Sequence, residues 1–226
     1  MAVQGNRRKL VRTAVWIGVV VLLAIFWFTG LLATVKPMSE AKSLAAVMGG
    51  GVAFDKEKYV DGIWDSRVVP TVEEKSVDLG ILVPALEKDA DKAGTTYGNN
   101  VGGADNFLVR FTGTVTAVDT KSETGSVTVS VPYKGGALPV SVLIGPIILG
   151  TALRDAVGFI TFEQFTNQIQ FGGVSDALND RVMKDVVSKL DLKALMGRKI
   201  SVDGAFTYDG ADAHDLQVTP VVVRME

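Results

Sequence analysis

The chain of 226 residues contains no cysteine and only one histidine, His214. Without cysteine there can be no disulfide framework, no thiolate metal site, no iron–sulfur cluster, no cysteine nucleophile and no lipid-modified cysteine. A single histidine excludes a multi-histidine metal site and leaves one candidate for a histidine general base. We therefore predict no metal site and no cofactor, and the sequence identifies no catalytic residue.

Charge is absent from one long stretch, because none of the 23 residues from Thr13 to Val35 is ionisable. A helix of this length covers about 34 Å, enough to cross a hydrocarbon core of about 30 Å. Four basic residues and no acidic ones lie in residues 1–12. Basic residues that flank a membrane span usually lie on its cytoplasmic side. We therefore expect a cytoplasmic basic tail over residues 1–12 and a transmembrane signal-anchor over residues 13–35.

The competing interpretation of this stretch is a cleavable signal peptide. The apolar region of a signal peptide usually spans only about 7 to 15 residues and ends at a small-x-small site. Here the apolar run is longer, and Ala33-Thr34-Val35 makes a poor cleavage site. Retention is therefore favoured, which predicts a single-pass protein of the bacterial inner membrane with its C-terminal domain in the periplasm.

The exported part is acidic once the basic tail is set aside. It has no basic stripe with interleaved aromatic residues, which argues against nucleic acid as a partner. Its first section, residues 36–105, reads as a helical linker or subdomain. A helix is expected from Lys56 to Val69, with Trp64 in the core and Pro70 as the stop.

The second section, residues 106–226, changes to a period of two with many β-branched residues, which is typical of strands. A helical connection is expected in its middle, with Thr161 and Gln164 at capping-box spacing. The fold class is therefore α+β, with an OB-like five-stranded barrel and a helical connection between strands 3 and 4; an open sheet is the alternative. The expected strands are 107–118, 127–131, 138–144, 198–208 and 216–224, and the expected helices are 161–171 and 175–196.

Two glycine- or aspartate-rich segments attract attention as possible sites. The segment from Gly145 to Thr151 has glycines spaced as in a phosphate-binding loop, but it lacks the lysine. The segment from Asp209 to Asp215 gathers three carboxylates and the histidine, but it lacks calcium-loop spacing and suits a turn. We predict a buried strand end for the first segment and a solvated hairpin tip for the second.

The tract from Thr151 to Phe171 places polar side chains among several phenylalanines. An arginine can hold a carboxylate or phosphate through paired hydrogen bonds, and amides beside an aromatic wall can bind sugar hydroxyls. The alternative is a buried polar network that satisfies neighbouring groups, which is the commoner arrangement. The predicted ligand-binding residues are Arg154, Asp155, Phe162, Asn167 and Gln168.

The same tract resembles the signature of an uncharacterised family of predicted periplasmic proteins, many of them lipoproteins. Several separated motifs agree with it in order, namely Ile144 to Phe171, Ile63-Trp64 with Glu74, Ala177 to Asp180, and Gly197 to Val221. The resemblance implies a domain of unknown function often encoded beside sugar ABC transporters, and it carries over no catalytic residue. This chain departs from the lipoprotein pattern because it has no cysteine, so we expect it to stay anchored through residues 13–35.

These observations predict a membrane-anchored periplasmic accessory or binding protein, associated with sugar ABC transport and not an enzyme. Its expected partners are the inner membrane and either subunits of a sugar ABC transporter or a small carbohydrate. Two alternatives stay open at this point. One is an enzyme that uses paired carboxylates on an envelope glycan or sugar. The other is a structural module that presents its sheet to another membrane protein.

Overall fold

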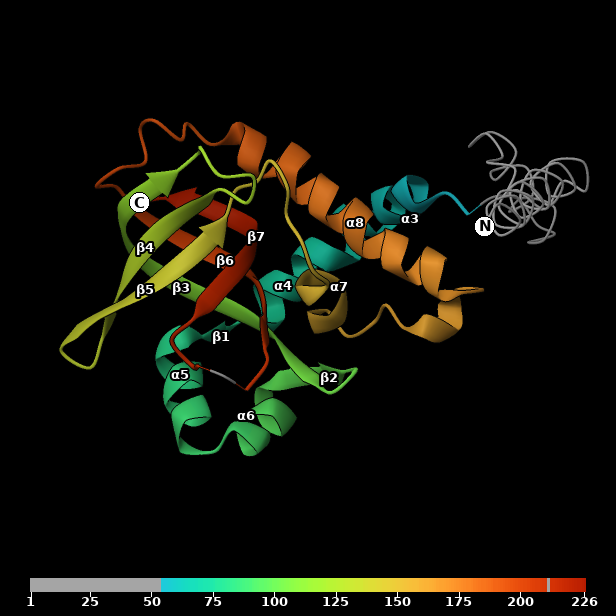
Figure 1. The fold of residues 1–226 in the computed structure, drawn as a ribbon, viewed down its shortest axis with the longest axis horizontal. Coiled ribbons are helices and arrows are strands. Elements are labelled where there is room, and N and C mark those ends of the chain that lie inside the picture. The colour runs from blue at the N-terminus through green and yellow to red at the C-terminus, as the bar shows by residue number, and fades with distance from the viewer. Residues whose placement is uncertain (1–53, 211) are drawn as a thin grey trace, which may run out of the picture. The chain divides into compact units, whose positions relative to one another are not determined.

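A seven-stranded sheet dominates the computed structural model, which describes residues 54–210 and 212–226 (Figure 1). Five of its strands pair in a closed circuit, in the order β3, β4, β5, β7, β6 and back to β3. Only the β5–β7 pairing within this circuit is parallel. The five strands are β3 (Ala104–Asp119), β4 (Ser126–Tyr133), β5 (Gly136–Leu143), β6 (Lys199–Tyr208) and β7 (Leu216–Met225).

The expectation of five strands was wrong for the sheet as a whole, because two short strands are added to it. β1 (Val77–Asp78) pairs parallel with β3, and β2 (Gly98–Val101) forms an antiparallel hairpin with the start of β3. Both lie in the section predicted to be helical. Neither is long enough to show an alternating apolar pattern, so a period of two could not reveal them.

The curvature of the circuit depends on close backbone contacts at two glycines. A Cβ atom on Gly113 of β3 would lie 2.5 Å from the backbone oxygen of Ser130 on β4. A Cβ atom on Gly204 of β6 would lie 2.4 Å from the backbone oxygen of Thr219 on β7, next to a break in the β6–β7 register. Glycine is required at both positions because any side chain would separate the paired strands.

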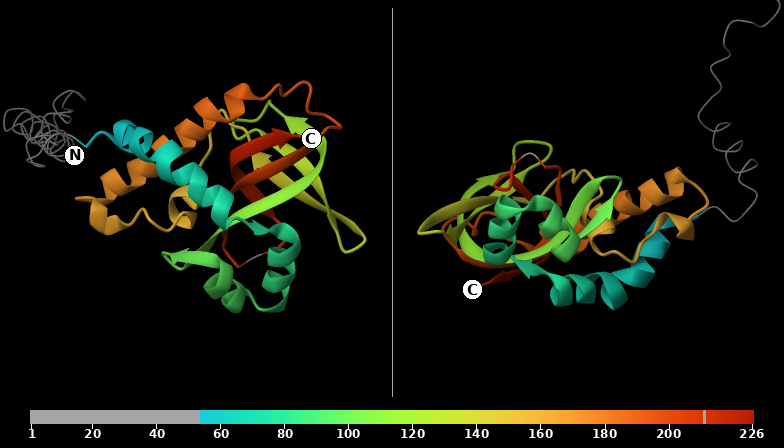
Figure 2. Two further views of the ribbon diagram at one scale, coloured as in Figure 1. Left: turned by 180° about the vertical axis from the view of Figure 1, so that it is seen from behind. Right: turned by 90° about the horizontal axis from the view of Figure 1, so that it is seen from below.

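The N-terminal helices form one continuous rod that runs beside α8 (Gln168–Asp185), as Figure 2 shows. The rod consists of α3 (Lys56–Ile63), a π-helical turn (Trp64–Val68) and α4 (Val69–Lys75). The prediction that Pro70 ends the helix was wrong. Pro70 is in the first turn of α4, directly after the π turn. The π turn changes the backbone hydrogen-bond pattern at the point where proline has no N–H to donate, so the helix can continue.

Two further helices, α5 (Leu79–Lys88) and α6 (Ala90–Tyr97), pack beside β1, β2 and β3. In the connection between β5 and β6, α7 (Ala152–Ala156) was not foreseen. In place of the expected helix over residues 161–171 there is one 3-10 turn (Phe162–Gln164) without a side-chain cap, then an irregular stretch, and only residues 168–171 are α-helical, as the start of α8. The second expected helix begins earlier, at Gln168, because Asn167 provides the N-cap, and it ends at Asp185 instead of continuing to residue 196.

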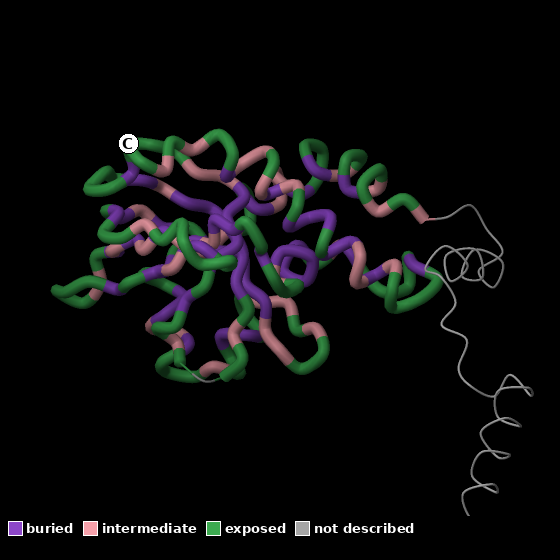
Figure 3. Tube along the Cα trace, turned by 45° about the horizontal axis from the view of Figure 1, so that its top comes forward, coloured by how far each residue is buried: buried purple, intermediate pink, exposed green. Residues whose placement is uncertain are grey.

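The core contains buried residues of both the strand circuit and the helices, and Figure 3 shows the buried positions running through the middle of the molecule. Its centre is a stacked pair of rings, Phe107 on β3 and Phe206 on β6, with centroids 5.4 Å apart. Leu178 on α8 is fully buried, and Trp64 is 2 % exposed. The prediction that Trp64 is a core residue is therefore confirmed.

The predictions for the N-terminus fall outside the described residues. Both the basic tail, residues 1–12, and the apolar run, residues 13–35, belong to this stretch. Within residues 54–210 and 212–226, no helix has the length and apolar character that a membrane span requires.

Candidate functional site

Arg154 and Asp155, which were predicted to bind a ligand, form a buried ion pair on α7. The arginine Nε donates to Asp155 Oδ1 at 2.7 Å, and Nη2 donates to Oδ2 at 3.0 Å. The two residues are only 6 % and 4 % exposed. This is a bidentate, charge-assisted pair, in which both carboxylate oxygens and two of the three guanidinium nitrogens are engaged.

The remaining contacts of this pair tie three elements together. Arg154 Nη1 donates to the backbone oxygen of Phe171 at 3.2 Å, and the guanidinium lies 3.6 Å from the centroid of the Phe171 ring. Asn99 Nδ2 on β2 donates to the backbone oxygen of Asp155 at 2.6 Å. We refer to Asn99, Arg154, Asp155 and Phe171 as the buried network. It locks α7 to α8 and β2, which matches the structural alternative considered for this tract.

The other three predicted residues lie at the surface. Asn167 caps α8 by accepting a hydrogen bond from the backbone N–H of Gln170 at 3.0 Å. Gln168 is exposed, and Phe162 is 39 % exposed with its ring 5.8 Å from that of Phe171. The fold therefore brings Arg154 and Asp155 together but does not join all five residues around one cavity. As a binding site the tract stays a prediction.

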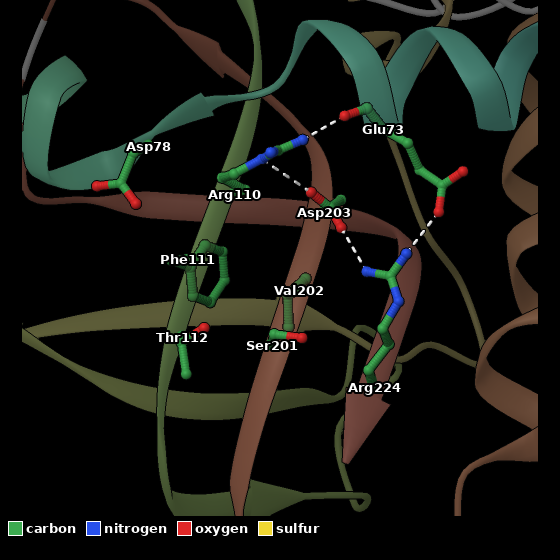
Figure 4. Close-up of a pocket in the computed structure, with 9 residues that line it drawn as sticks. All are labelled: Glu73, Asp78, Arg110, Phe111, Thr112, Ser201, Val202, Asp203 and Arg224. Atoms are coloured by element: carbon green, nitrogen blue, oxygen red, sulfur yellow. Dashed lines mark hydrogen bonds and ion pairs between the residues drawn. The ribbon is translucent and has the colours of Figure 1, made fainter. Parts of the chain in front are cut away.

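A cavity of about 360 Å³ lies against β3, β6 and β7, beneath α4 (Figure 4). We call it the charged cavity, because two arginines and three acidic residues line it. Asp203 Oδ2 accepts from Arg224 Nη1 at 2.8 Å, and Asp203 Oδ1 lies 3.3 Å from Arg110 Nε. Glu73 on α4 contacts both arginines, since its carboxylate pairs with Arg224 and its backbone oxygen accepts a hydrogen bond from Arg110.

The charges of this cavity satisfy one another. Each of the two arginines contacts Asp203, whose side chain is 9 % exposed, and each also contacts Glu73. These ion pairs and hydrogen bonds therefore hold α4 against the outside of the sheet. A ligand carboxylate or phosphate would have to displace existing partners from both guanidinium groups, which makes this cavity a weak candidate for a binding site.

A second cavity, of about 260 Å³, is lined mainly by uncharged polar and acidic side chains, and we call it the polar cavity. It lies over the ends of β5 and β6 and the start of β7, between the segment after β5 and the β6–β7 connection. Its lining consists of Leu143, Leu149, Gly150, Thr151, Ala152, Thr207, Tyr208, Asp209, Asp212, Asp215, Gln217 and Thr219.

Several polar groups of the polar cavity have no internal partner. Among the described residues, no hydrogen bond or ion pair involves the side chains of Thr151, Asp215, Gln217 or Thr219. Thr151, Asp215 and Gln217 are exposed, so their polar groups are open to solvent, whereas Thr219 is only 2 % exposed. Unpartnered polar groups directed to one cavity are thus the feature expected of a site that binds a polar molecule.

The carboxylate of Asp212, which lines the polar cavity, is bound by a residue that does not line it. Asp212 Oδ1 accepts from the backbone N–H of His214 at 2.9 Å and lies 3.2 Å from His214 Nδ1. These hydrogen bonds, the backbone one first, lower the pKa of Asp212. His214 Nε2 in turn lies 3.1 Å from Glu87 on α5. The histidine therefore links the β6–β7 connection to α5, and it does not line the polar cavity.

The segment after β5 is positioned by α8. Asn179, which is 7 % exposed, donates through Nδ2 to the backbone oxygens of Ile148 and Gly150 at 3.2 and 3.1 Å. Gly150 has a φ of +95°, a conformation that side chains disfavour. One buried amide thus sets the path of the backbone that forms one wall of the polar cavity.

The sequence identified the two walls of the polar cavity separately but not the cavity. Residues 145–151 and 209–215 were singled out, and neither was predicted to be a site. They are about sixty residues apart in the chain, and the pairing of β5 with β7 brings them together. Gln217 and Thr219 had no distinguishing signal, because their polarity alone is ordinary for a strand.

Comparisons with known proteins agree with the fold. A crystal structure of an OB-fold protein from Thermotoga maritima matches with a TM-score of 0.62 and 19 % sequence identity, covering 77 % of this chain and all of the other. No curated protein matches the chain. A family model described as "Predicted periplasmic lipoprotein (DUF2291)" matches residues 19–224. The chain therefore belongs to this family of predicted periplasmic lipoproteins, a domain of unknown function, as its motifs predicted.

Proposed function

We propose that the protein is a membrane-anchored accessory or binding protein of the periplasm, associated with sugar ABC transport. We further propose that its polar cavity binds a small carbohydrate. The observation that carries this proposal is the set of unpartnered polar side chains at the cavity, Thr151, Asp215, Gln217 and Thr219. The family description supports the location, since it assigns its members to the periplasm.

The chemistry of the cavity suits a polyhydroxylated ligand. Carboxylate and amide oxygens accept hydrogen bonds from sugar hydroxyls, and threonine hydroxyls can both donate and accept. Tyr208 and Leu143 add apolar surface to the same lining, against which the C–H faces of a sugar ring can pack. A volume of about 260 Å³ favours a molecule of monosaccharide size over a long glycan.

The state of Asp212 does not suit the role of a general acid. An enzyme that cleaves glycosidic bonds needs one carboxylic acid whose pKa is raised, so that it is protonated near neutral pH. The pKa of Asp212 is lowered by its hydrogen bonds to His214, which is the opposite direction. This carboxylate suits the role of a permanent hydrogen-bond acceptor.

Thermal unfolding of the full chain in mild detergent, with a panel of pentoses, hexoses and polyols, tests the proposal. A sugar at a hundred times its dissociation constant should stabilise the fold by about 2.7 kcal/mol. The shift in melting temperature should disappear in Thr219→Val and Gln217→Ala. It should persist in Thr112→Val, the same substitution as the first but in the charged cavity.

Two outcomes would contradict this assignment. Stabilisation that survives Thr219→Val but is lost in Phe162→Ala and Gln168→Ala would move the site to the predicted tract. No stabilisation by any sugar at millimolar concentration would point instead to a protein partner. The membrane subunits of a sugar transporter are the first candidates for that partner.

A further inference from the structure

The starts of α3 and α8 lie together at the end of the helices farthest from the sheet (Figures 1 and 2). This end carries unusually exposed apolar side chains. Ile169, in the first turn of α8, is 86 % exposed, and Phe162 is 39 % exposed. Ile169 and Phe54 also line one shallow cavity of about 280 Å³. We call Phe54, Phe162 and Ile169 the apolar tip.

The apolar tip rests on a rigid base of aromatic rings. Phe54 packs edge-on against Phe165 with centroids 5.4 Å apart, and Phe165 lies 5.7 Å from Phe171. The ring of Phe162 also packs edge-on against that of Phe171, with centroids 5.8 Å apart. Because these rings hold one another, the outward apolar groups cannot easily turn inward to escape water. Ile169 in particular is left largely in water by the fold, and an external apolar partner would stabilise it.

The position of the apolar tip in the chain indicates what covers it. Phe54 is the first described residue, and only eighteen residues, 36–53, separate it from the apolar run that ends at Val35. Eighteen residues reach at most about 60 Å when fully extended. If residues 13–35 span the membrane, a connection of this length lets the apolar tip reach the bilayer surface.

Charge near the apolar tip is slightly acidic. Lys56, beside Phe54, has Asp176 at 3.9 Å and Glu57 at 4.0 Å, so one ammonium lies between two carboxylates. The tip therefore has no basic surplus that would attract anionic lipid or an acidic protein. Contact with lipid is expected to depend on apolar burial and not to be strengthened by anionic lipid.

We propose that the apolar tip docks on the membrane surface, with Ile169 and Phe162 entering the region between the lipid headgroups and the acyl chains. This rests on the membrane anchoring proposed above. Docking at this point would orient the sheet and the polar cavity relative to the membrane. The surface would then act as a second contact beside the anchor.

The absence of cysteine from the chain allows a direct test. The full chain carrying Ile169→Cys, labelled with an environment-sensitive fluorophore, is reconstituted into phosphatidylethanolamine–phosphatidylglycerol vesicles with nitroxide groups on the acyl chains. The matched control is Ile81→Cys, an isoleucine in the first turn of α5 that is 56 % exposed. We expect blue-shifted emission and strong quenching at position 169, and neither at position 81.

Each other result overturns the proposal. Equal quenching at both positions, or none at either, would mean that the apolar tip has no preferred contact with lipid. A blue shift at position 169 without quenching would mean that protein, and not lipid, covers it. Flotation of the unlabelled chain with vesicles tests the anchoring separately, so a chain that floats but shows no quenching refutes the docking alone.

Discussion

The buried network around Arg154 and the polar cavity both place polar side chains among apolar ones, but their hydrogen bonding differs. In the buried network the guanidinium and the carboxylate face each other, and the third guanidinium nitrogen meets a backbone oxygen. In the polar cavity, Gln217 and Thr219 face open space. Polar groups that satisfy one another mark a structural joint, whereas accessible polar groups without a partner in the protein mark the candidate site.

The largest effect should come from breaking the buried network. Arg154→Ala leaves the Asp155 carboxylate buried without its partner, so we expect a loss of about 3–5 kcal/mol in the free energy of unfolding. Denaturant unfolding measures it. The control is Arg198→Ala, at an exposed arginine, which should change stability by no more than about 0.5 kcal/mol. If both variants lose equally little, the network is not the structural joint described here.

A smaller effect is expected from Asn179, which joins the two regions through α8. Asn179→Ala removes the donor to the backbone oxygens of Ile148 and Gly150, and we expect a cost of about 1–3 kcal/mol. Because these oxygens set one wall of the polar cavity, stabilisation by sugar should weaken as well. Unfolding with and without sugar separates the two effects. Unchanged sugar stabilisation in a destabilised variant would show that this wall is not needed for binding.

The cap of α8 allows a comparison between adjacent residues. Asn167→Ala removes the hydrogen bond to the backbone N–H of Gln170, so stability should fall by about 1 kcal/mol. Gln168→Ala, at an exposed position with no such bond, should stay within about 0.5 kcal/mol. Equal losses would show that Asn167 does not act as a cap. Loss of sugar binding in both would support the predicted tract over the polar cavity.

The smallest effect concerns pH. The pKa of Asp212 is lowered by folding, so its contribution to stability is complete at neutral pH and is lost as the pH falls through the folded pKa, below the ordinary value of about 3.9. Asp212→Asn should therefore lower the melting temperature slightly at pH 5 to 7, and the difference should vanish in stronger acid. A difference that persists at the lowest pH would contradict the assigned hydrogen bonds.

Much of the fold could be predicted, since it depends on local pattern. β3, β4, β6 and β7 lie where alternating and β-branched residues predicted strands, and the α+β class with a helical connection is as expected. The predictions that were wrong concerned features that depend on contacts between distant residues or on local backbone geometry. The π turn before Pro70 and the two short strands β1 and β2 leave no periodic signal in so few residues.

The candidate site was harder to predict. Arg154 and Asp155 were picked for their chemistry, but sequence cannot show that two neighbouring side chains satisfy each other. Asp209 to Asp215 was assigned to a hairpin tip from its turn residues, and it does connect β6 to β7. That the same connection faces Thr151 could not be inferred, because an isolated turn does not reveal what lies opposite.

The sequence by itself determined which cysteine and histidine chemistry is absent, where the five long strands lie and which family the chain belongs to. Each of these follows from residue type or from short periodic patterns. Tertiary structure alone decided where the polar groups meet. Strand pairing brought residues 145–151 and 209–215 to one cavity, while helix packing joined Arg154 to Phe171. Such meetings depend on the three-dimensional path of the chain, which no local pattern records.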